Sequence, residues 1–371
     1  MQDLRSLLDV LPQRVQDKID KPDELTEVIM DSGRSLELRY GTSAKKYFSS
    51  VKITDAEVEH VCNQISEFGV DNRAGIDGTL HRISCIRDRK NRILGLTCRV
   101  GRAFEGCVKL LQEFVDSGLS ILVLGAPGTG KTTKLRDIAR YASVELEKSV
   151  VIVDTSNEIA GEGAHPHPAV GLARRLMVPR GSSQADIMIE AVENHCPEII
   201  IVDEISTEAE ATACRTIAQR GVQLIATAHG HKLEDLAQNP PLLDILGGVA
   251  YVTLGDAMMA QNKGAKTRPE PKTNPTFALI IELEGFNEIA VHPDVRAAFA
   301  AVLRGRVVRP ARYRLVEGEV LCLEPAFIEP EKDLTPAPFA NKPFEAKLPR
   351  VVEENERKRR RPNQGKRQRR R

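Results

Sequence analysis

A glycine-rich segment that ends in a lysine and two threonines is the first group of residues whose types and spacing could do chemistry. The segment fits the pattern G-x-x-x-x-G-K-[ST]. Glycines let successive backbone N–H groups point at phosphate oxygens, and a lysine in this place reaches the β- and γ-phosphates. We therefore predict a phosphate-binding loop, with the Thr132 hydroxyl as a Mg²⁺ ligand. The nine residues of this loop are Gly125, Ala126, Pro127, Gly128, Thr129, Gly130, Lys131, Thr132 and Thr133.

Two carboxylates end a second apolar run. The run Ile199–Val202 leads directly into Asp203 and Glu204. Ligands bind at the carboxyl ends of the strands in open parallel sheets, so both side chains are predicted to approach the phosphates. Asp203 is expected to complete the Mg²⁺ site with Thr132, and Glu204 to orient and polarise the attacking water. His229, at the tip of the next strand, is predicted to contact the γ-phosphate and report hydrolysis.

The histidines and cysteines could in principle bind a metal or form disulfides, but their spacing favours simpler interpretations. His165 and His167 lie in a Pro-rich loop, but no third ligand is evident, which favours a loop without a metal. The seven cysteines are scattered and form no C-x-x-C, which favours reduced thiols over disulfides or zinc. A guanine-specificity motif of the N-K-x-D type is absent, which disfavours a GTPase.

The phosphate loop, the two carboxylates and His229 each follow a predicted strand. Residues 121–124 and 149–154 are buried apolar runs, and helical patterns separate the successive runs. Such β-α-β units predict a mostly parallel sheet between helices. A helix over 104–120 is expected to lead into this sheet. Four of its apolar residues are predicted to share one face: Phe104, Val108, Leu111 and Phe114.

The 371 residues divide into four predicted parts. Residues 1–103 are expected to form an N-terminal α/β domain, and residues 104–262 the core around the phosphate loop. Residues 274–323 are expected to form a small β/α appendage, and the Pro-rich residues 324–371 to be disordered. No apolar run approaches the length of a membrane span and no secretory signal is evident. We therefore expect no membrane insertion and a cytoplasmic location.

The formal net charge of +1 conceals an uneven distribution. Residues 357–371 hold ten Lys or Arg and no acidic residue, so the rest of the chain is net acidic. This tail is either a solvated charged terminus or an electrostatic anchor for DNA or RNA. Nucleic-acid binding measured with and without residues 357–371 distinguishes the two. Trp is absent, so aromatic platforms for stacked nucleic-acid bases are not expected.

Taken together, these motifs resemble the conserved P-loop ATPase of cyanobacteria and plastid genomes, which is related to stage III sporulation protein AA. More distantly they resemble the secretion and pilus-retraction ATPases, which are ring-forming motors. The similarity covers roughly residues 20–305. Its motifs are the phosphate loop and the segments Val100–Ala103, Val151–Gly161, Ala191–His195, Val202–Ile205 and Ala226–Gly230.

The resemblance implies a RecA/AAA-like P-loop NTPase core that hydrolyses ATP with Mg²⁺. It also implies a homo-oligomer, as a hexamer, and a location in the plastid stroma for a plastid-encoded chain. By analogy with the acidic box of the motors, Glu158 beside Asp154 competes with Glu204 as the catalytic base, and Glu204 is favoured. His229 matches their histidine box. Candidates for an arginine that completes the site are Arg99, Arg102, Arg174, Arg175, Arg215 and Arg220.

One departure from the family leaves an alternative open. Many members continue into a nucleic-acid-binding domain with an Arg-x-x-x-His motif, and no such domain follows residue 307. Nucleic-acid binding is therefore not carried over. The alternative function is a nucleotide-gated module that holds nucleic acid through its tail and hydrolyses ATP negligibly. The adjacent Asp203 and Glu204 disfavour this alternative, because binding alone does not require a residue that activates water.

Overall fold

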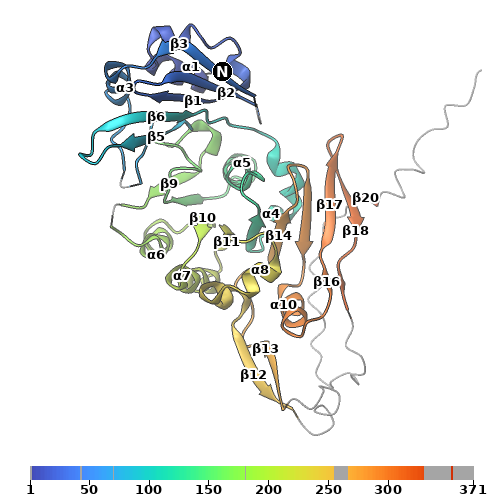
Figure 1. The fold of residues 1–371 in the computed structure, drawn as a ribbon. Coiled ribbons are helices and arrows are strands. Elements are labelled where there is room, and N and C mark those ends of the chain that lie inside the picture. The colour runs from blue at the N-terminus through green and yellow to red at the C-terminus, as the bar shows by residue number, and fades with distance from the viewer. Residues whose placement is uncertain are drawn as a thin grey trace, which may run out of the picture.

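The structure is a computed structural model that describes residues 2–41, 44–69, 71–179, 181–254 and 266–329, and the backbone of 352–353. The described residues form a six-stranded sheet, a ten-stranded sheet and two two-stranded ribbons. Figure 1 shows the six-stranded sheet above the core and the β12–β13 ribbon projecting at the opposite end. The predicted basic tail at 357–371 lies outside the described residues.

The N-terminal part is an antiparallel sheet packed with short helices. Its strand order is β3-β2-β1-β6-β5-β4. A capping box formed by Thr54 and Glu57 starts α3. The elements are α1 Gln2–Val10, α2 Gln13–Gln16, η1 Pro22–Glu24, β1 Leu25–Asp31, β2 Ser35–Tyr40, β3 Ala44–Lys52, α3 Asp55–Cys62, β4 Arg73–Gly75, β5 Arg82–Arg87 and β6 Ile93–Arg99.

The core is built from β-α-β units, as the sequence predicts. Its strand order is β20-β18-β17-β15-β14-β7-β11-β10-β8-β9, and the six strands from β14 to β9 are mutually parallel. The first elements are η2 Cys107–Leu110, α4 Gln112–Asp116, β7 Ile121–Gly125, α5 Lys131–Val144, β8 Val150–Asp154, η3 Pro168–Val170, β9 Arg174–Met177, α6 Gln184–His195, β10 Ile199–Ile205, α7 Glu208–Gln219 and β11 Gln223–Ala228.

The remaining elements extend this sheet or pack beside it. They are α8 Leu233–Ala237, η4 Pro240–Leu246, β12 Val249–Thr253, β13 Thr267–Pro271, β14 Leu279–Leu283, β15 Glu288–His292, α10 Val295–Leu303, β16 Val308–Arg309, β17 Ala311–Val316, β18 Glu319–Glu324, β19 Phe327–Ile328 and β20 Val352–Glu353. Among the described residues, no helix combines the length and apolar character needed to span a bilayer.

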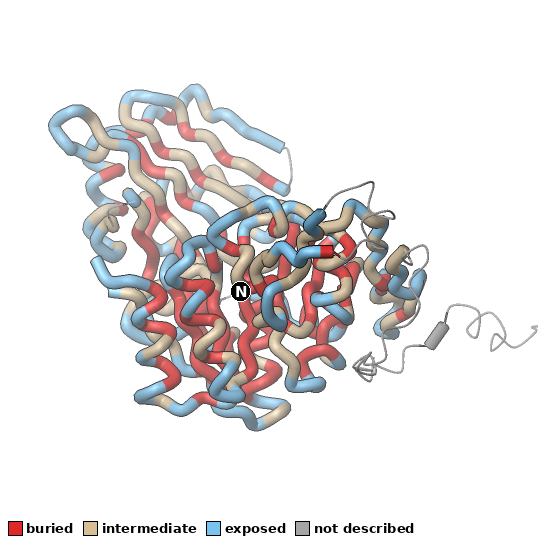
Figure 2. The backbone as a smooth tube through the Cα atoms, turned by 90° about the horizontal axis from the view of Figure 1, so that it is seen from below, coloured by how far each residue is buried: buried red, intermediate tan, exposed pale blue. Residues whose placement is uncertain are grey.

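Both faces of the core sheet are buried along its central strands, which explains why these strands are continuously apolar. Leu122 and Leu124 of β7 pack with α6, α7, α8 and α10 on one face. Ile121 and Val123, which point the opposite way, pack with α4 and α5 on the other. Figure 2 shows buried residues gathered along the inner segments, with exposed residues on the peripheral turns. This double packing holds the carboxyl ends of the strands in place.

Residues 279–324 differ from the appendage expected at 274–323. Strand β14 pairs in parallel with β7, the strand that precedes the phosphate loop, with Leu279 opposite Ile121. Strands β15, β17 and β18 then continue the same sheet in antiparallel fashion. The segment is therefore an extension of the core sheet, because both neighbouring strands are apolar enough to be buried side by side. The pairing of Phe327–Ile328 with β16 also gives structure to the first residues of the segment expected to be disordered.

The helix expected over 104–120 is also different. It is split into η2 and α4, and Gly106 before η2 adopts a left-handed conformation with φ of 82°. A chain that turns at Gly106 cannot continue a right-handed helix back to Phe104. Val108, Leu111 and Phe114 are buried as predicted, but Phe104 is left exposed.

A buried polar contact ties helix α1 to both parts of the molecule. The Nε2 of His81 lies 2.6 Å from the backbone oxygen of Asp3, and the Nδ1 of His81 accepts from the Gly101 N–H at 3.0 Å. The Asp3 carboxylate lies 2.9 Å from Nε2 of His167. His167 therefore joins the loop after β8 to α1.

Candidate functional site

The phosphate loop at 125–133 has the backbone that its sequence requires. A Cβ on Gly125 would lie 2.8 Å from Oγ1 of Thr129 and 3.0 Å from Cβ of Leu283, so only glycine fits there. Gly130 has φ of 89°, a conformation that favours glycine. Gly130 is also the N-cap of α5 and provides no side-chain cap. The first N–H groups of α5 are therefore free to bind an anion.

Lys131 lies at the start of α5, inside the loop in which it is predicted to bind phosphate. Its Nζ donates to the backbone oxygen of Gly125 at 2.6 Å. This contact is local, and a phosphate oxygen is the better acceptor because it carries charge. Beside the loop, the N–H of Gly125 donates to the oxygen of Gly230 at 3.0 Å. The strand end that carries His229 is therefore hydrogen-bonded directly to the phosphate loop.

Asp203 occupies a bulge in β10. In the pairing of β10 with β11, Val202 lies opposite Ala226 and Glu204 opposite Thr227, so Asp203 is the extra residue. Bulges re-aim side chains and are common beside functional sites. The Thr227 hydroxyl donates to the backbone oxygen of Asp203 and stabilises the bulge. The bulge thus places consecutive carboxylates, Asp203 and Glu204, at one edge of the sheet.

The negative charges at this edge repel one another. Burial is the main cause that raises the pKa of Asp203 to about 7, and the nearby charges of Asp154, Glu158 and Glu204 add to it. Arg136 opposes the increase. A partly buried carboxylate with acidic neighbours favours a bound cation, since a cation stabilises the charged form. The donors at this place therefore suit Mg²⁺, which takes one or two protein carboxylates and fills its other positions with phosphate and water oxygens.

Asp154, at the end of β8, shapes the loop that carries Glu158. Its carboxylate accepts from the backbone N–H groups of Glu158, Ile159 and Ala160, at 3.1, 3.2 and 2.8 Å. Burial raises the pKa of Asp154 to about 6, against the lowering effect of these hydrogen bonds. From the other side, Arg136 donates to the oxygens of Ile159 at 2.7 Å and Glu158 at 2.5 Å. The backbone of the loop that carries Glu158 is thus held by the side chains of Asp154 and Arg136.

The two candidate bases have different surroundings. Glu158 is 35% exposed and pairs with two arginines of the N-terminal sheet, Arg82 at 2.6 Å and Arg73 at 3.5 Å. Glu204 is 54% exposed, and the one ion pair recorded for it within the described chain is with Nδ1 of His229 at 3.9 Å. Lone pairs occupied by guanidinium donors are not available to water. Glu204 therefore has the greater freedom to accept a proton.

The segment around Glu204 is fixed by neighbours that sequence reasoning did not identify. Gln184, the first residue of α6, donates to the Glu204 oxygen at 2.8 Å and contacts the Thr155 hydroxyl. Glu210 accepts from the N–H groups of Ser206 at 2.7 Å and of the next residue at 3.0 Å, which starts α7 directly after the site. The T-x-x-E pattern before α7 is a signal that could have identified Glu210.

These side chains converge on a cavity of about 850 Å³ between the two sheets. The predicted residues Lys131, Thr132, Asp203, Glu204 and His229 all line it, as does Glu158. Gly125, Ala126 and Thr129 contribute to the loop without being among the lining residues. The cavity lies within the size range of ligand pockets, roughly 300–1,000 Å³. A cavity that brings a phosphate loop together with carboxylates suits a phosphorylated ligand with a metal ion.

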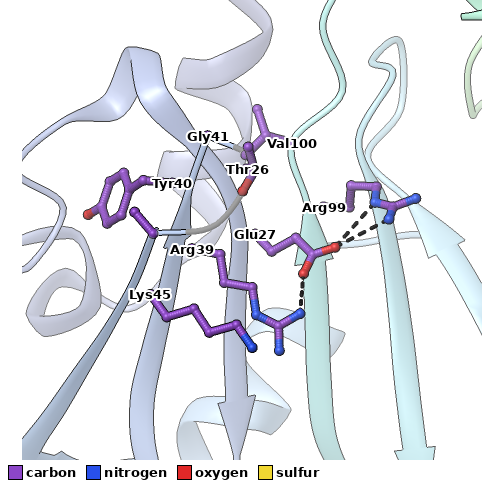
Figure 3. A pocket seen from close by; sticks show the side chains of 9 residues that line it. Thr26, Glu27, Arg39, Tyr40, Gly41, Lys45, Arg99 and Val100 are labelled. Atoms are coloured by element: carbon purple, nitrogen blue, oxygen red, sulfur yellow. Dashed lines mark hydrogen bonds and ion pairs between the residues drawn. The ribbon is translucent and has the colours of Figure 1, made fainter. Parts of the chain in front are cut away.

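Of the six arginines proposed from the sequence, only Arg99 and Arg102 line this cavity. Arg102 donates to backbone oxygens, including that of Leu25 at 2.7 Å. Arg99 pairs with Glu27 at 3.3 Å. Figure 3 shows Glu27 between Arg99 and Arg39, at a separate hollow on the N-terminal sheet. Arg215 and Arg220 pair instead with Asp244 of η4 and Glu193 of α6.

Three arginines that the sequence did not suggest line the cavity: Arg73, Arg82 and Arg136. The first two come from β4 and β5 in the N-terminal part, and their pairing with Glu158 depends on the packing of one sheet against the other. Sequence spacing contains no signal for such a contact. The cavity therefore receives positive charge from the N-terminal domain of the same chain.

The fold and the cavity define a class: this is an α/β protein with a P-loop NTPase core of the RecA-like type. Among solved structures, that of the pilus retraction motor PilT with bound ADP matches with a TM-score of 0.51 and 14% identity, over 76% of this chain and 82% of that chain. At this identity the similarity shows the fold alone.

Residues 72–257 match the family described as sporulation stage III, protein AA. The uncharacterized protein ycf45 of Porphyra purpurea is 48% identical over 82% of this chain and 54% of its own length, so the chain spans about half of that relative. The uncharacterized protein ycf45 of Cyanidium caldarium is 43% identical over 82% of this chain and 92% of its own length. The chain belongs to this family, and the resemblance seen in the motifs is confirmed.

The charge cluster predicts a gain in stability when Asp203 is neutralised. Because the pKa of Asp203 is about 7 in the folded chain and about 4 in an unfolded one, the folded state keeps a proton that the unfolded state loses between these pH values. The free energy of unfolding contributed by this group therefore falls as pH rises from about 4 to 7. Without nucleotide or Mg²⁺, Asp203→Asn should raise the unfolding free energy at pH 8 by on the order of 1–3 kcal/mol.

Denaturant unfolding at pH 8 and pH 4 measures this effect. The gain should disappear at pH 4, where Asp203 is protonated in the folded wild type. Glu208→Gln, at an exposed position of α7, is the control and should change stability little at either pH. An equal gain at both pH values, or no gain at pH 8, contradicts the unfavourable burial and charge repulsion described for Asp203.

Proposed function

We propose that the protein binds ATP with Mg²⁺ in the cavity between its two sheets and hydrolyses it. The observation that carries the proposal is the convergence of the phosphate loop with Asp203, Glu204 and His229 on one cavity. A phosphate loop alone suits many reactions. A loop that faces a carboxylate free to activate water, next to a second carboxylate suited to Mg²⁺, suits hydrolysis of the terminal phosphate.

In the proposed reaction, the residues mainly position reactants and stabilise charge. The loop N–H groups and Lys131 bind the phosphate oxygens. Thr132 and Asp203 hold Mg²⁺, which when bound neutralises charge on the phosphate oxygens. Glu204 accepts a hydrogen bond from the attacking water and aligns it. His229 lies beside Glu204, on a segment hydrogen-bonded to the loop, so it is placed to respond to the loss of the γ-phosphate.

The N-terminal domain has a part in this proposal. Arg82 and Arg73 hold Glu158 at the cavity wall, and a bound triphosphate would offer them stronger acceptors. Glu158 is the less suitable base, because an ion pair occupies its carboxylate. We assign Glu158 to the positioning of these two arginines, and Glu204 to the activation of water.

Steady-state release of phosphate from ATP tests these roles. Wild-type protein should turn over with Mg²⁺, and Glu204→Gln should keep ATP binding while losing turnover by about 10²-fold or more, the usual contribution of a general base. Glu158→Gln should have a smaller effect. Glu162→Gln is the matched control, because Glu162 lines the same cavity and contacts Asn157 at 3.2 Å, and it should be close to wild type.

Two outcomes contradict the assignment. Wild-type turnover in Glu204→Gln with strong loss in Glu158→Gln would exchange the two roles. ATP binding without measurable turnover in the wild type would favour the alternative, a nucleotide-gated binding module.

We further propose that the chain assembles into a homo-oligomer, as a hexamer. Strand β9 is one edge of the core sheet; its last residue, Met177, and Leu172 just before the strand leave large apolar side chains exposed. Exposed edges with apolar side chains are suited to contact with another chain. Light scattering with Mg²⁺ and ATP should give six times the chain mass of 41.0 kDa. A single-chain mass under all nucleotide conditions would reject the assembly.

A further inference from the structure

Two exposed aromatic rings form a pair beside the phosphate loop. Phe104 is 53% exposed and Phe286 is 52% exposed. Their ring centroids lie 6.5 Å apart, with an edge-to-face angle of 74°. Edge-to-face aromatic contact is favourable, but it leaves about half of each side chain facing solvent. Adjacent exposed apolar groups of this kind mark a binding surface.

The rings border a small cavity between the chain segment that enters the core and the turn from β14 to β15. Its volume is about 150 Å³. Ligand pockets that enclose a whole ligand have roughly 300–1,000 Å³, so this cavity suits one portion of a ligand. Its lining is largely apolar and consists of Phe104, Glu105, Gly106, Cys107, Leu110, Phe286, Asn287 and Leu315.

This small cavity is fixed next to the phosphate loop. A Cβ added to Gly130 would lie 3.8 Å from Cδ2 of Phe286, so the ring borders the last glycine of the loop. Lys134, one turn after Gly130, donates from Nζ to the Phe286 oxygen at 2.8 Å. The same Nζ lies 4.7 Å from the centre of the Phe286 ring.

Lys134 contacts both the backbone and the ring of Phe286. Its side chain is buried, and a buried ammonium group is costly without partners. The Phe286 carbonyl and ring provide those partners, through a hydrogen bond and a cation–π contact. Helix α5, whose N-terminus is predicted to bind phosphates, is therefore joined directly to the turn that carries Phe286.

We propose that Phe104 and Phe286 form the nucleobase subsite of the nucleoside triphosphate whose phosphates bind at residues 125–133. The inference rests on the nucleotide binding proposed above and adds the residues that recognise the base. Two features select this occupant. The cavity adjoins the phosphate loop at Gly130, and its aromatic lining matches the flat π-face that every base offers. Stacking of a base on an aromatic side chain contributes about 1–3 kcal/mol.

Binding measurements with two ligands test the subsite. Calorimetry with Mg²⁺ gives dissociation constants for ATP and for inorganic tripolyphosphate, which has the phosphates but no base. Phe286→Ala and Phe104→Ala should each weaken ATP binding by about 5- to 100-fold, as the loss of stacking requires. Neither should change tripolyphosphate binding more than twofold, which also shows that the variants are folded. Phe286→Tyr keeps a ring and should bind ATP like the wild type.

Phe327→Ala is the matched control. Phe327 is a 45% exposed ring on β19, where it contacts Arg309, and it does not line the small cavity. Its removal should leave both ligands unaffected.

The outcomes separate this inference from the proposed function. ATP binding that is unchanged in both alanine variants overturns the subsite while nucleotide binding stands. An equal loss of ATP and tripolyphosphate binding also overturns it, because the rings would then act on the loop and not on a base. A wild type that binds neither ligand overturns nucleotide binding itself, and the subsite with it.

Discussion

Burial of the carboxylates at the ends of β8 and β10, together with the repulsion felt by Asp203, is the constraint on which the rest of the site depends. The parallel pairing of these strands, with Val202 opposite Val153, brings Asp154 and Asp203 to the same edge of the sheet. Burial raises the pKa of both groups above the usual range of Asp, and the charge of Asp154 adds to the increase at Asp203. Two buried carboxylates so close together destabilise the folded chain when no cation is bound. The arrangement persists because the apolar packing on both faces of the sheet fixes the strand ends.

The neighbouring elements are arranged to offset this charge. Backbone N–H groups of the loop after β8 donate to Asp154, and Arg136 contacts that loop from α5. Arg82 reaches Glu158 from the N-terminal sheet. The acidic core of the site is thus surrounded by donors from three parts of the chain. The cation predicted at Asp203 would supply the remaining positive charge, which connects the stability of the fold to occupancy of the site.

Local patterns predicted much of this arrangement. The phosphate loop, the buried strands and the carboxylates near the end of β10 all follow from residue type and spacing within short segments. The position of Arg82 against Glu158 could not be predicted, because it depends on how two sheets pack across 76 residues of sequence. The bulge at Asp203 likewise depends on the register of β10 against β11, which its own residues do not reveal.

Two further differences have local causes that are clear only in the structure. The left-handed Gly106 ends a helical pattern that would have buried Phe104, and leaves its ring beside Phe286. The parallel pairing of β14 with β7 makes an expected appendage part of the core. Both differences alter the surroundings of the phosphate loop, so they change the expected ligand contacts as well as the fold.

Binding of ATP to wild-type protein and to Lys131→Ala, measured by calorimetry with and without Mg²⁺, tests the central claim most directly. The account predicts saturable, Mg²⁺-dependent binding to the wild type. Because Lys131 is expected to make a charge-assisted contact of about 1.5–3 kcal/mol with the phosphates, its removal should weaken binding at least tenfold. Equal affinity of the two proteins, or binding that is indifferent to Mg²⁺, would contradict the assignment of the cavity as a site for ATP with its metal ion.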